Sequence, residues 1–152
     1  KMSETTNREI VTSRLISAPR ERVWEAFTDP EQIDKWWGPN GFTNITETME
    51  VKPGGTWRFH MHGPDGTDWP NLISYLEVLP QERLVFDHGD FEDPKQFRNT
   101  ITFEEQDGKT LVTMTALFPT AEIRNMKIEK YGAIEGGKQT LAHLEQFLES
   151  LN

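Results

Sequence analysis

The sequence contains no cysteine, which excludes disulfide bonds, a thiolate nucleophile and cysteine-ligated metal centres. Basic residues are also few: 16 Lys and Arg stand against 25 Asp and Glu, for a formal net charge of -9. Because phosphate binding requires clustered positive charge, we expect no nucleic-acid partner, and an anionic membrane surface is equally disfavoured. No apolar run approaches the roughly 18 residues of a membrane span.

Motifs that hold phosphate groups or activate a serine nucleophile are also missing, since the sequence has neither a glycine-rich phosphate loop nor a nucleophile elbow. The residues before Arg8 are polar and contain no apolar stretch of the kind found in signal peptides. We therefore expect a cytoplasmic protein with no membrane association and no resident cofactor.

A length of 152 residues fits one domain, and nine Phe, five Trp and two Tyr supply large apolar side chains for its core. No repeat or linker interrupts the sequence. We predict a single domain over residues 8–152, preceded by a disordered N-terminus at residues 1–7. Lys1, which stands before Met2, is interpreted as a cloning remnant.

Hydrophobic periodicity predicts the order of the elements. A strand over Asn7–Ser17 precedes two short helices, Arg20–Thr28 and a second one from Pro30 that presents a Trp pair. Between Thr43 and Phe118 the period is two, which predicts about five strands in an antiparallel meander. A helix then begins within Ala121–Tyr131 and runs nearly to the end of the chain.

The C-terminal helix has an amphipathic pattern. Its apolar stripe consists of Ile134, Leu141, Leu144, Phe147, Leu148 and Leu151. Gly136 and Gly137 lie inside this helix, where each Gly costs about 1 kcal/mol relative to Ala. Three explanations stay open: close packing, a bend, or space left for another molecule.

Several short sequence motifs, in order along nearly the whole chain, resemble motifs of the AHSA1-like (activator of Hsp90 ATPase homologue) family of the START/Bet v 1-like (SRPBCC) superfamily. They are Ala18–Pro30, Trp36-Trp37-Gly38-Pro39, Pro53-Gly54-Gly55, Tyr75–Phe86 and Glu135-Gly136-Gly137. The resemblance implies an α+β helix-grip fold, in which a curved antiparallel sheet wraps around a long C-terminal helix and two short helices follow the first strand. It also implies a cavity between sheet and helix.

Strand alternation and the implied cavity together predict a ligand-binding wall. Its apolar members are Trp37, Trp57, Phe59, Tyr75, Phe86, Phe103 and Met114, with Gly137 leaving room beside them. Two polar residues join this set by parity. Glu47 falls on the face of its strand that holds Ile45 and Met49, and the alternative is that it reaches solvent or pairs with an Arg. His88 falls in the inward set of its strand, and the alternative is that it caps a strand end.

His60 and His62, two residues apart on one strand face, are a candidate metal pair. No third ligand is nearby in the sequence, so we expect two solvent-facing histidines and no metal.

Three functions are compatible with these residues. We predict binding of a small apolar or aromatic ligand in the cavity, with no committed catalytic residue. The first alternative is a polyketide-cyclase-like enzyme in which Glu47, Tyr75 or His88 handles protons. The second is a chaperone-cofactor domain with a role in stress response, for which the family resemblance is the only support. A homodimer is a further alternative for a protein partner.

Overall fold

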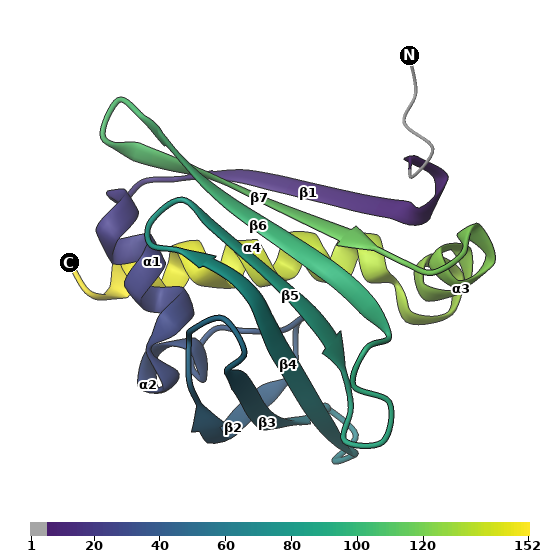
Figure 1. Cartoon of the computed structure of the whole chain (residues 1–152). Helices are drawn as coiled ribbons and strands as arrows, with labels where there is room; N and C mark the ends of the chain where they lie inside the picture. Colours follow the sequence, from purple (N-terminus) through teal and green to yellow (C-terminus); the bar gives the residue numbers. More distant parts are fainter. Residues whose placement is uncertain (1–5) are drawn as a thin grey trace.

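The computed structural model describes residues 6–152, which form a seven-stranded antiparallel sheet wrapped around the C-terminal helix (Figure 1). The strands are β1 Glu9–Ile16, β2 Thr43–Met49, β3 Thr56–His62, β4 Asp68–Leu79, β5 Arg83–Gly89, β6 Phe97–Gln106 and β7 Lys109–Leu117. The helices are the 3-10 helix η1 Thr6–Arg8, followed by α1 Arg20–Thr28, α2 Pro30–Ile33, α3 Ala121–Tyr131 and α4 Ala133–Ser150. This arrangement is the predicted α+β helix-grip fold.

The strand order is β1-β7-β6-β5-β4-β3-β2, so the first strand pairs with the last and the other strands form a meander. The β6–β7 hairpin turns at Asp107 and Gly108, whose φ angles of 51° and 81° are both positive. Such two-residue turns match the right-handed twist of the flanking strands, which is why Asp-Gly favours this hairpin. Six strands lie between Thr43 and Phe118, one more than the sequence pattern predicted.

The predicted C-terminal helix is two helices rather than one. Gly132 separates α3 from α4 and has a φ of 62°, in the left-handed region that glycine adopts at low cost. Its backbone N–H donates to the carbonyl of Ile128, which closes the last turn of α3. The prediction of one continuous helix was therefore wrong at this position, although α4 is the longest element of the fold.

The second short helix is also shorter than predicted. The Asp29 side chain caps α2 by accepting a hydrogen bond from the Glu31 backbone N–H, and Pro30 is the first residue, as expected. The helix ends at Ile33, so Trp36 and Trp37 belong to the turn after it. At the N-terminus, residues 1–5 of the segment predicted to be disordered lie outside the described residues, and residues 6 and 7 belong to η1.

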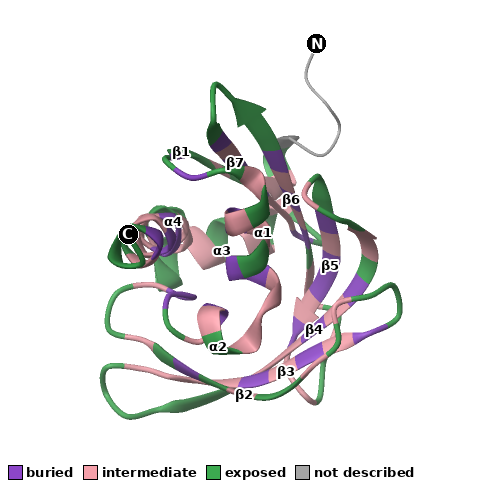
Figure 2. Ribbon diagram, turned by 90° about the vertical axis from the view of Figure 1, so that its left-hand side faces the viewer, coloured by how far each residue is buried: buried purple, intermediate pink, exposed green. Residues whose placement is uncertain are grey.

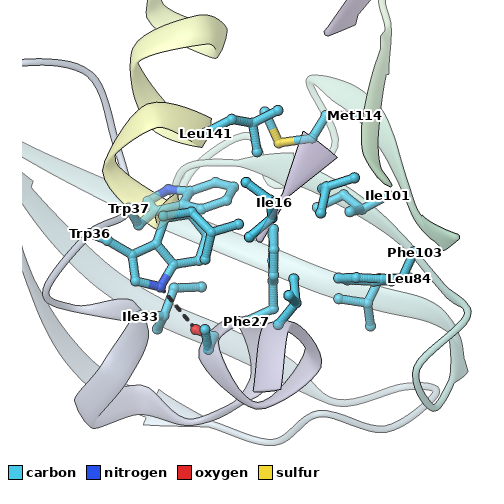
Figure 3. Packing of buried hydrophobic residues seen from close by; sticks show 14 of the residues in the cluster. Ile16, Phe27, Ile33, Trp36, Trp37, Leu84, Ile101, Phe103, Met114 and Leu141 are labelled. Carbon is cyan, nitrogen blue, oxygen red and sulfur yellow. Dashed lines mark hydrogen bonds between the residues drawn. The ribbon is translucent and has the colours of Figure 1, made fainter. Parts of the chain in front are cut away.

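The core lies between the inner face of the sheet and the helices, where the buried stretches of the ribbon face one another (Figure 2). Three leucines of α4, Leu141, Leu144 and Leu148, are buried there, as the apolar stripe predicted. Trp36 packs against Phe27 and donates a 3.0 Å hydrogen bond from its indole nitrogen to the carbonyl of Ala26 (Figure 3). The indole nitrogen is thus satisfied inside an apolar environment.

Candidate functional site

A pocket of about 250 Å³ lies between the inner face of the sheet and the first half of α4. Its walls come from β1, β3, β5, β6 and β7 with the residue after β7, from α4, and from the segment after α2. The lining residues are Ile10, Thr12, Trp37, Gly38, Pro39, Met61, His88, Phe97, Asn99, Met114, Ala116, Phe118, Ala133, Gly137 and Thr140. We call this space the inner pocket. Most of its lining is apolar, so it suits a hydrophobic molecule.

A second hollow of about 400 Å³ adjoins the inner pocket. The two share Pro39, Met61, His88 and Phe97 as wall residues. We call the second hollow the outer pocket. Further from the core its lining becomes more polar and includes Trp69, Asn71, Asp90, Gln96, Lys127 and Tyr131. The last two residues come from α3, so this helix borders the approach to the inner pocket.

The structure brings only part of the predicted wall into the inner pocket. Trp37, His88, Met114 and Gly137 line it. The remaining predicted aromatic residues belong to the packed core. Trp57, Tyr75 and Phe86 surround a void of only about 10 Å³, which has no room for a ligand.

Two further predicted wall residues also have aromatic partners in the core. Phe59 stacks on Trp57 with ring centroids 3.7 Å apart. Phe103 makes edge-to-face contacts with Trp24 and Phe27, at centroid distances of 5.4 and 5.2 Å. Inward parity therefore identified buried residues, but burial alone does not distinguish a core position from a pocket position.

Tyr75, which was predicted to line the ligand-binding wall, points into the core. Burial raises the pKa of its phenol, because the charged form loses its hydration there. The hydroxyl group therefore stays protonated at neutral pH, and it lies apart from the inner pocket.

Glu47 lies on the outer face of the sheet, which corrects its predicted place in the wall. A β-bulge between Thr46 and Thr48 shifts the register of β2 against β3, so the alternation is not continuous along this strand. Ile45 precedes the bulge, pairs with the outward-facing His60 and is 59% exposed on the same face as Glu47. Met49 follows the bulge, pairs with Trp57 and packs against the core. The Glu47 carboxylate contacts the Arg58 guanidinium at 3.3 Å and also hydrogen-bonds His60. This is the alternative in which Glu47 reaches solvent and pairs with an Arg.

The Glu47–His60 contact predicts a pH-dependent contribution to stability. The hydrogen bond to Glu47 raises the pKa of His60, and the same bond lowers the pKa of Glu47. The His60 contribution is present below its ordinary pKa of 6.5 and is lost as pH rises through the raised value. The Glu47 contribution is present above 4.5 and is lost as pH falls through the lowered value. The pair therefore stabilises the fold most between these two pH values.

We expect wild type to exceed His60→Gln in free energy of unfolding at pH 5.5, and this excess to shrink at pH 8.5. Urea denaturation of both proteins at the two pH values measures it. Since these side chains are largely exposed, the effect is small. The double variant Glu47→Gln/His60→Gln is the control and should show no further pH-dependent difference from His60→Gln. An excess that grows toward pH 8.5 would contradict the assignment.

His60 and His62 face outward, as the alternation of β3 predicted, and both approach Asp68. The His60 Nδ1 atom lies 3.1 Å from the Asp68 carboxylate, and His62 Nε2 lies 3.8 Å from it. Within residues 6–152, no three His, Cys, Asp or Glu side chains are grouped as metal ligands. The absence of bound metal remains a prediction for the protein in solution.

His88 is the titratable residue of the inner pocket. Its Nε2 atom lies 2.7 Å from Asn71 Oδ1, and the Asn71 amide nitrogen donates to the carbonyl of Trp69. Burial, together with a smaller effect of the positive charge of Lys127, lowers the pKa of His88 to about 4. The imidazole is therefore neutral at physiological pH, and it is held in place by Asn71 rather than by a carboxylate.

Asn99 is a pocket residue that the sequence analysis missed. It is 7% exposed, and its amide oxygen has no hydrogen-bond partner among the described residues. Leaving a buried polar group unsatisfied costs about 1–3 kcal/mol. The sequence signal was available: Asn99 shares the inward parity of Ile101 and Phe103, so it is a polar residue in an apolar set.

Gly137 has two roles in the structure. It lines the inner pocket, and its backbone also lies close to β1. A Cβ atom added at Gly137 would lie 2.9 Å from Thr12 Oγ1, whereas one added at Gly136 would meet only Pro39 Cβ at 3.7 Å. Two features therefore explain a glycine at position 137: the close approach to Thr12 and the pocket space beside it. The pocket volume of about 250 Å³ is also smaller than the 300 Å³ or more that is usual for ligand sites.

None of the helices within residues 6–152 combines the length and the apolar character needed to cross a bilayer.

Comparison with curated proteins gives no match. Among solved structures, protein Ms6760 from Mycobacterium smegmatis is 25% identical, with a TM-score of 0.87, and the match covers 99% of this chain and 97% of that one. A protein from Arthrobacter aurescens is 23% identical, with a TM-score of 0.86 and coverage of 98% and 90%.

An AHSA1-like protein from Aeromonas hydrophila has the same fold at 20% identity, with a TM-score of 0.74 and coverage of 94% and 93%. The family model described as "Activator of Hsp90 ATPase homolog 1-like protein" matches residues 17–149, which is most of the chain. This match agrees with the helix-grip fold and with the short sequence motifs. The chain belongs to the AHSA1-like family of the Bet v 1-like superfamily.

Proposed function

We propose that the protein binds a small, predominantly apolar molecule in the inner pocket. The observation that carries this proposal is a space of about 250 Å³ between sheet and helix, lined mainly by aliphatic and aromatic side chains. A dry apolar cavity of roughly 150 Å³ is large enough to take up benzene. The inner pocket therefore suits a molecule of one or two rings, or a short branched chain.

The arrangement of the walls supports entry of such a molecule from the side of α3. His88 and Phe97 border both the inner and the outer pocket, and their rings lie 4.9 Å apart. None of the residues of α3 is buried, so its movement disturbs less of the core than movement of α4 would. Tyr131 and Lys127 place mixed polar and apolar character at this approach.

The enzyme alternative has less support. Of the three residues proposed to handle protons, Glu47 lies on the outer face and Tyr75 lies in the core. Among residues 6–152, His88 is the one titratable side chain that lines the inner pocket. Acid–base chemistry on a bound molecule generally uses a second positioned proton donor or acceptor, and the pocket offers no titratable one. No observed contact favours the chaperone-cofactor alternative over ligand binding.

Substitution of a pocket residue by a larger one tests the proposal. We expect wild-type protein to bind the neutral two-ring fluorophore 1-naphthylamine saturably, and Ala116→Phe to bind it about 10-fold or more weakly, because the new ring occupies the inner pocket. Fluorescence titration measures both affinities. Ala116→Leu, a smaller change at the same position, should give an intermediate affinity.

Thr115→Phe is the matched control, because Thr115 is adjacent in β7 and faces the opposite side of the sheet. It should retain wild-type affinity. Thermal unfolding of each variant establishes that it is folded. Absence of saturable binding to wild type, or an equal loss in Ala116→Phe and Thr115→Phe, would contradict binding in the inner pocket.

A further inference from the structure

The wall of the inner pocket contains a side-chain amide, that of Asn99, which forms no hydrogen bond to the described residues. Asn99 lies on β6 between Phe86 of β5 and Ala116 of β7, neither of which offers a polar side chain. The Asn99 amide oxygen is buried and unpartnered, and its amide nitrogen forms no hydrogen bond to any residue from 6 to 152. Buried polar groups are nearly always paired, but the Asn99 amide oxygen is too enclosed for a bound molecule to reach it. The unpaired amide nitrogen is not enclosed in this way, so it is the group that a partner from outside the chain can reach.

A second unpaired polar atom belongs to His88. The Asn71 amide nitrogen already donates to the carbonyl of Trp69, so Asn71 Oδ1 acts as the acceptor toward His88. A neutral imidazole has one N–H group, and His88 uses it, on Nε2, in this bond. Its Nδ1 atom is therefore left as an acceptor with no partner among the described residues.

These two groups are neighbours on the inner face of the sheet. His88 pairs with Phe97 across β5 and β6, and Asn99 pairs with Phe86 in the same ladder. They are therefore diagonal neighbours, at roughly 7–8 Å between backbone positions, and their side chains point to the same face. Both line the inner pocket. One small polar group of a bound molecule can therefore reach both side chains.

We propose that the inner pocket recognises a neutral hydrophobic alcohol or phenol, whose hydroxyl group donates to His88 Nδ1 and accepts from the Asn99 amide. This inference deepens the proposed function and rests on it. A hydroxyl group has one donor and two acceptor positions, which matches an acceptor and an amide side by side. Ketones and ethers only accept, so they leave His88 Nδ1 unpaired.

A carboxylate does not fit this site. It also only accepts hydrogen bonds, and it brings a charge that must be paired when it is buried. No Lys or Arg lines the inner pocket, and Lys127 belongs to the outer pocket. The class of ligand is thus set by two neutral groups, with the apolar body of the molecule against the aromatic and aliphatic walls.

Calorimetric titration with three probes of one shape tests this assignment: 2-naphthol, 2-methylnaphthalene and 2-naphthoate. We expect wild type to bind 2-naphthol most tightly and 2-naphthoate most weakly. In Asn99→Leu, a change to an apolar residue of similar size, the ratio of affinity for 2-naphthol over 2-methylnaphthalene should fall about 10-fold. Asn99→Val is a second variant at this position and should lower the ratio in the same direction.

Thr100→Val is the matched control, because Thr100 is adjacent in β6 and faces the outer side of the sheet. Its probe ratio should equal that of wild type. Without ligand, Asn99→Leu should unfold at a temperature equal to or above that of wild type, because the unpaired amide has been removed.

The two levels of proposal fail in different ways. If neither 2-naphthol nor 2-methylnaphthalene binds wild type, or if binding persists in Ala116→Phe, the proposed function is wrong. If both bind in the inner pocket and their affinity ratio is the same in wild type and Asn99→Leu, the amide has water as its only partner. In that case the hydroxyl assignment alone is overturned.

Discussion

Replacing Leu144 with Ala should lower the free energy of unfolding by about 2–5 kcal/mol, the usual range for a buried leucine. Leu144 has no exposed surface and belongs to the cluster that joins α4 to the sheet and to α1. Truncation removes apolar contacts on several elements at once, and the surrounding side chains can fill the space only in part. Urea denaturation followed by circular dichroism measures the change.

Leu151→Ala is the matched control, since it is the same substitution on the residue that follows the end of α4 and is 53% exposed. We expect it to change stability by no more than about 0.5 kcal/mol, as is usual for exposed positions. A loss below about 0.5 kcal/mol for Leu144→Ala would contradict the packing of α4 against the sheet, on which the pocket depends.

Gly137→Leu should lower both stability and probe binding. The added Cβ would lie 2.9 Å from Thr12 Oγ1, so α4 and β1 must separate slightly, and the rest of the side chain competes for the inner pocket. Overpacking of this kind costs about 1–3 kcal/mol. Leucine has a better helix propensity by about 1 kcal/mol, which offsets part of the cost. We expect a folded protein, less stable than wild type, with weakened binding of 1-naphthylamine.

Gly136→Leu separates the steric effect from helix propensity. Its Cβ would make only an ordinary contact with Pro39, so the same substitution one residue earlier should leave stability unchanged or higher. In a Thr12→Ala background, Gly137→Leu should cost less than it does in wild type, because the nearest atom has been removed. Equal stability of Gly136→Leu and Gly137→Leu would show that Thr12 does not limit the approach of α4.

Some parts of this fold follow from local chemistry, and these the sequence predicted well. Asp29 and Pro30 begin α2 for two local reasons. The Asp29 side chain accepts a hydrogen bond from a free backbone N–H, and Pro30 has no backbone N–H that would need a partner. Asp107 and Gly108 form the β6–β7 turn because both tolerate positive φ. The spacing of leucines in α4 identified its buried face, since the helical period fixes which side chains share a side.

Two of the wrong predictions, the place of Glu47 and the single C-terminal helix, share one cause, because local periodicity was extended across a local irregularity. The bulge in β2 breaks the alternation between Glu47 and Met49, so Met49 faces the core while Glu47 shares the outer face with Ile45. The left-handed Gly132 divides a helical pattern into α3 and α4. Both features are allowed by the sequence around them, but strand pairing and packing decide whether they occur.

The sequence by itself determined the family, the order of the elements and the membership of most of the core, because these depend on periodicity, turn chemistry and ordered motifs. Only the tertiary structure decided which inward residues enclose space. Phe86 and His88 share one parity, yet Phe86 lies in the core and His88 lines the inner pocket. The tertiary structure also placed Asn99 diagonally beside His88, since the register between β5 and β6 brings together positions that no local pattern connects.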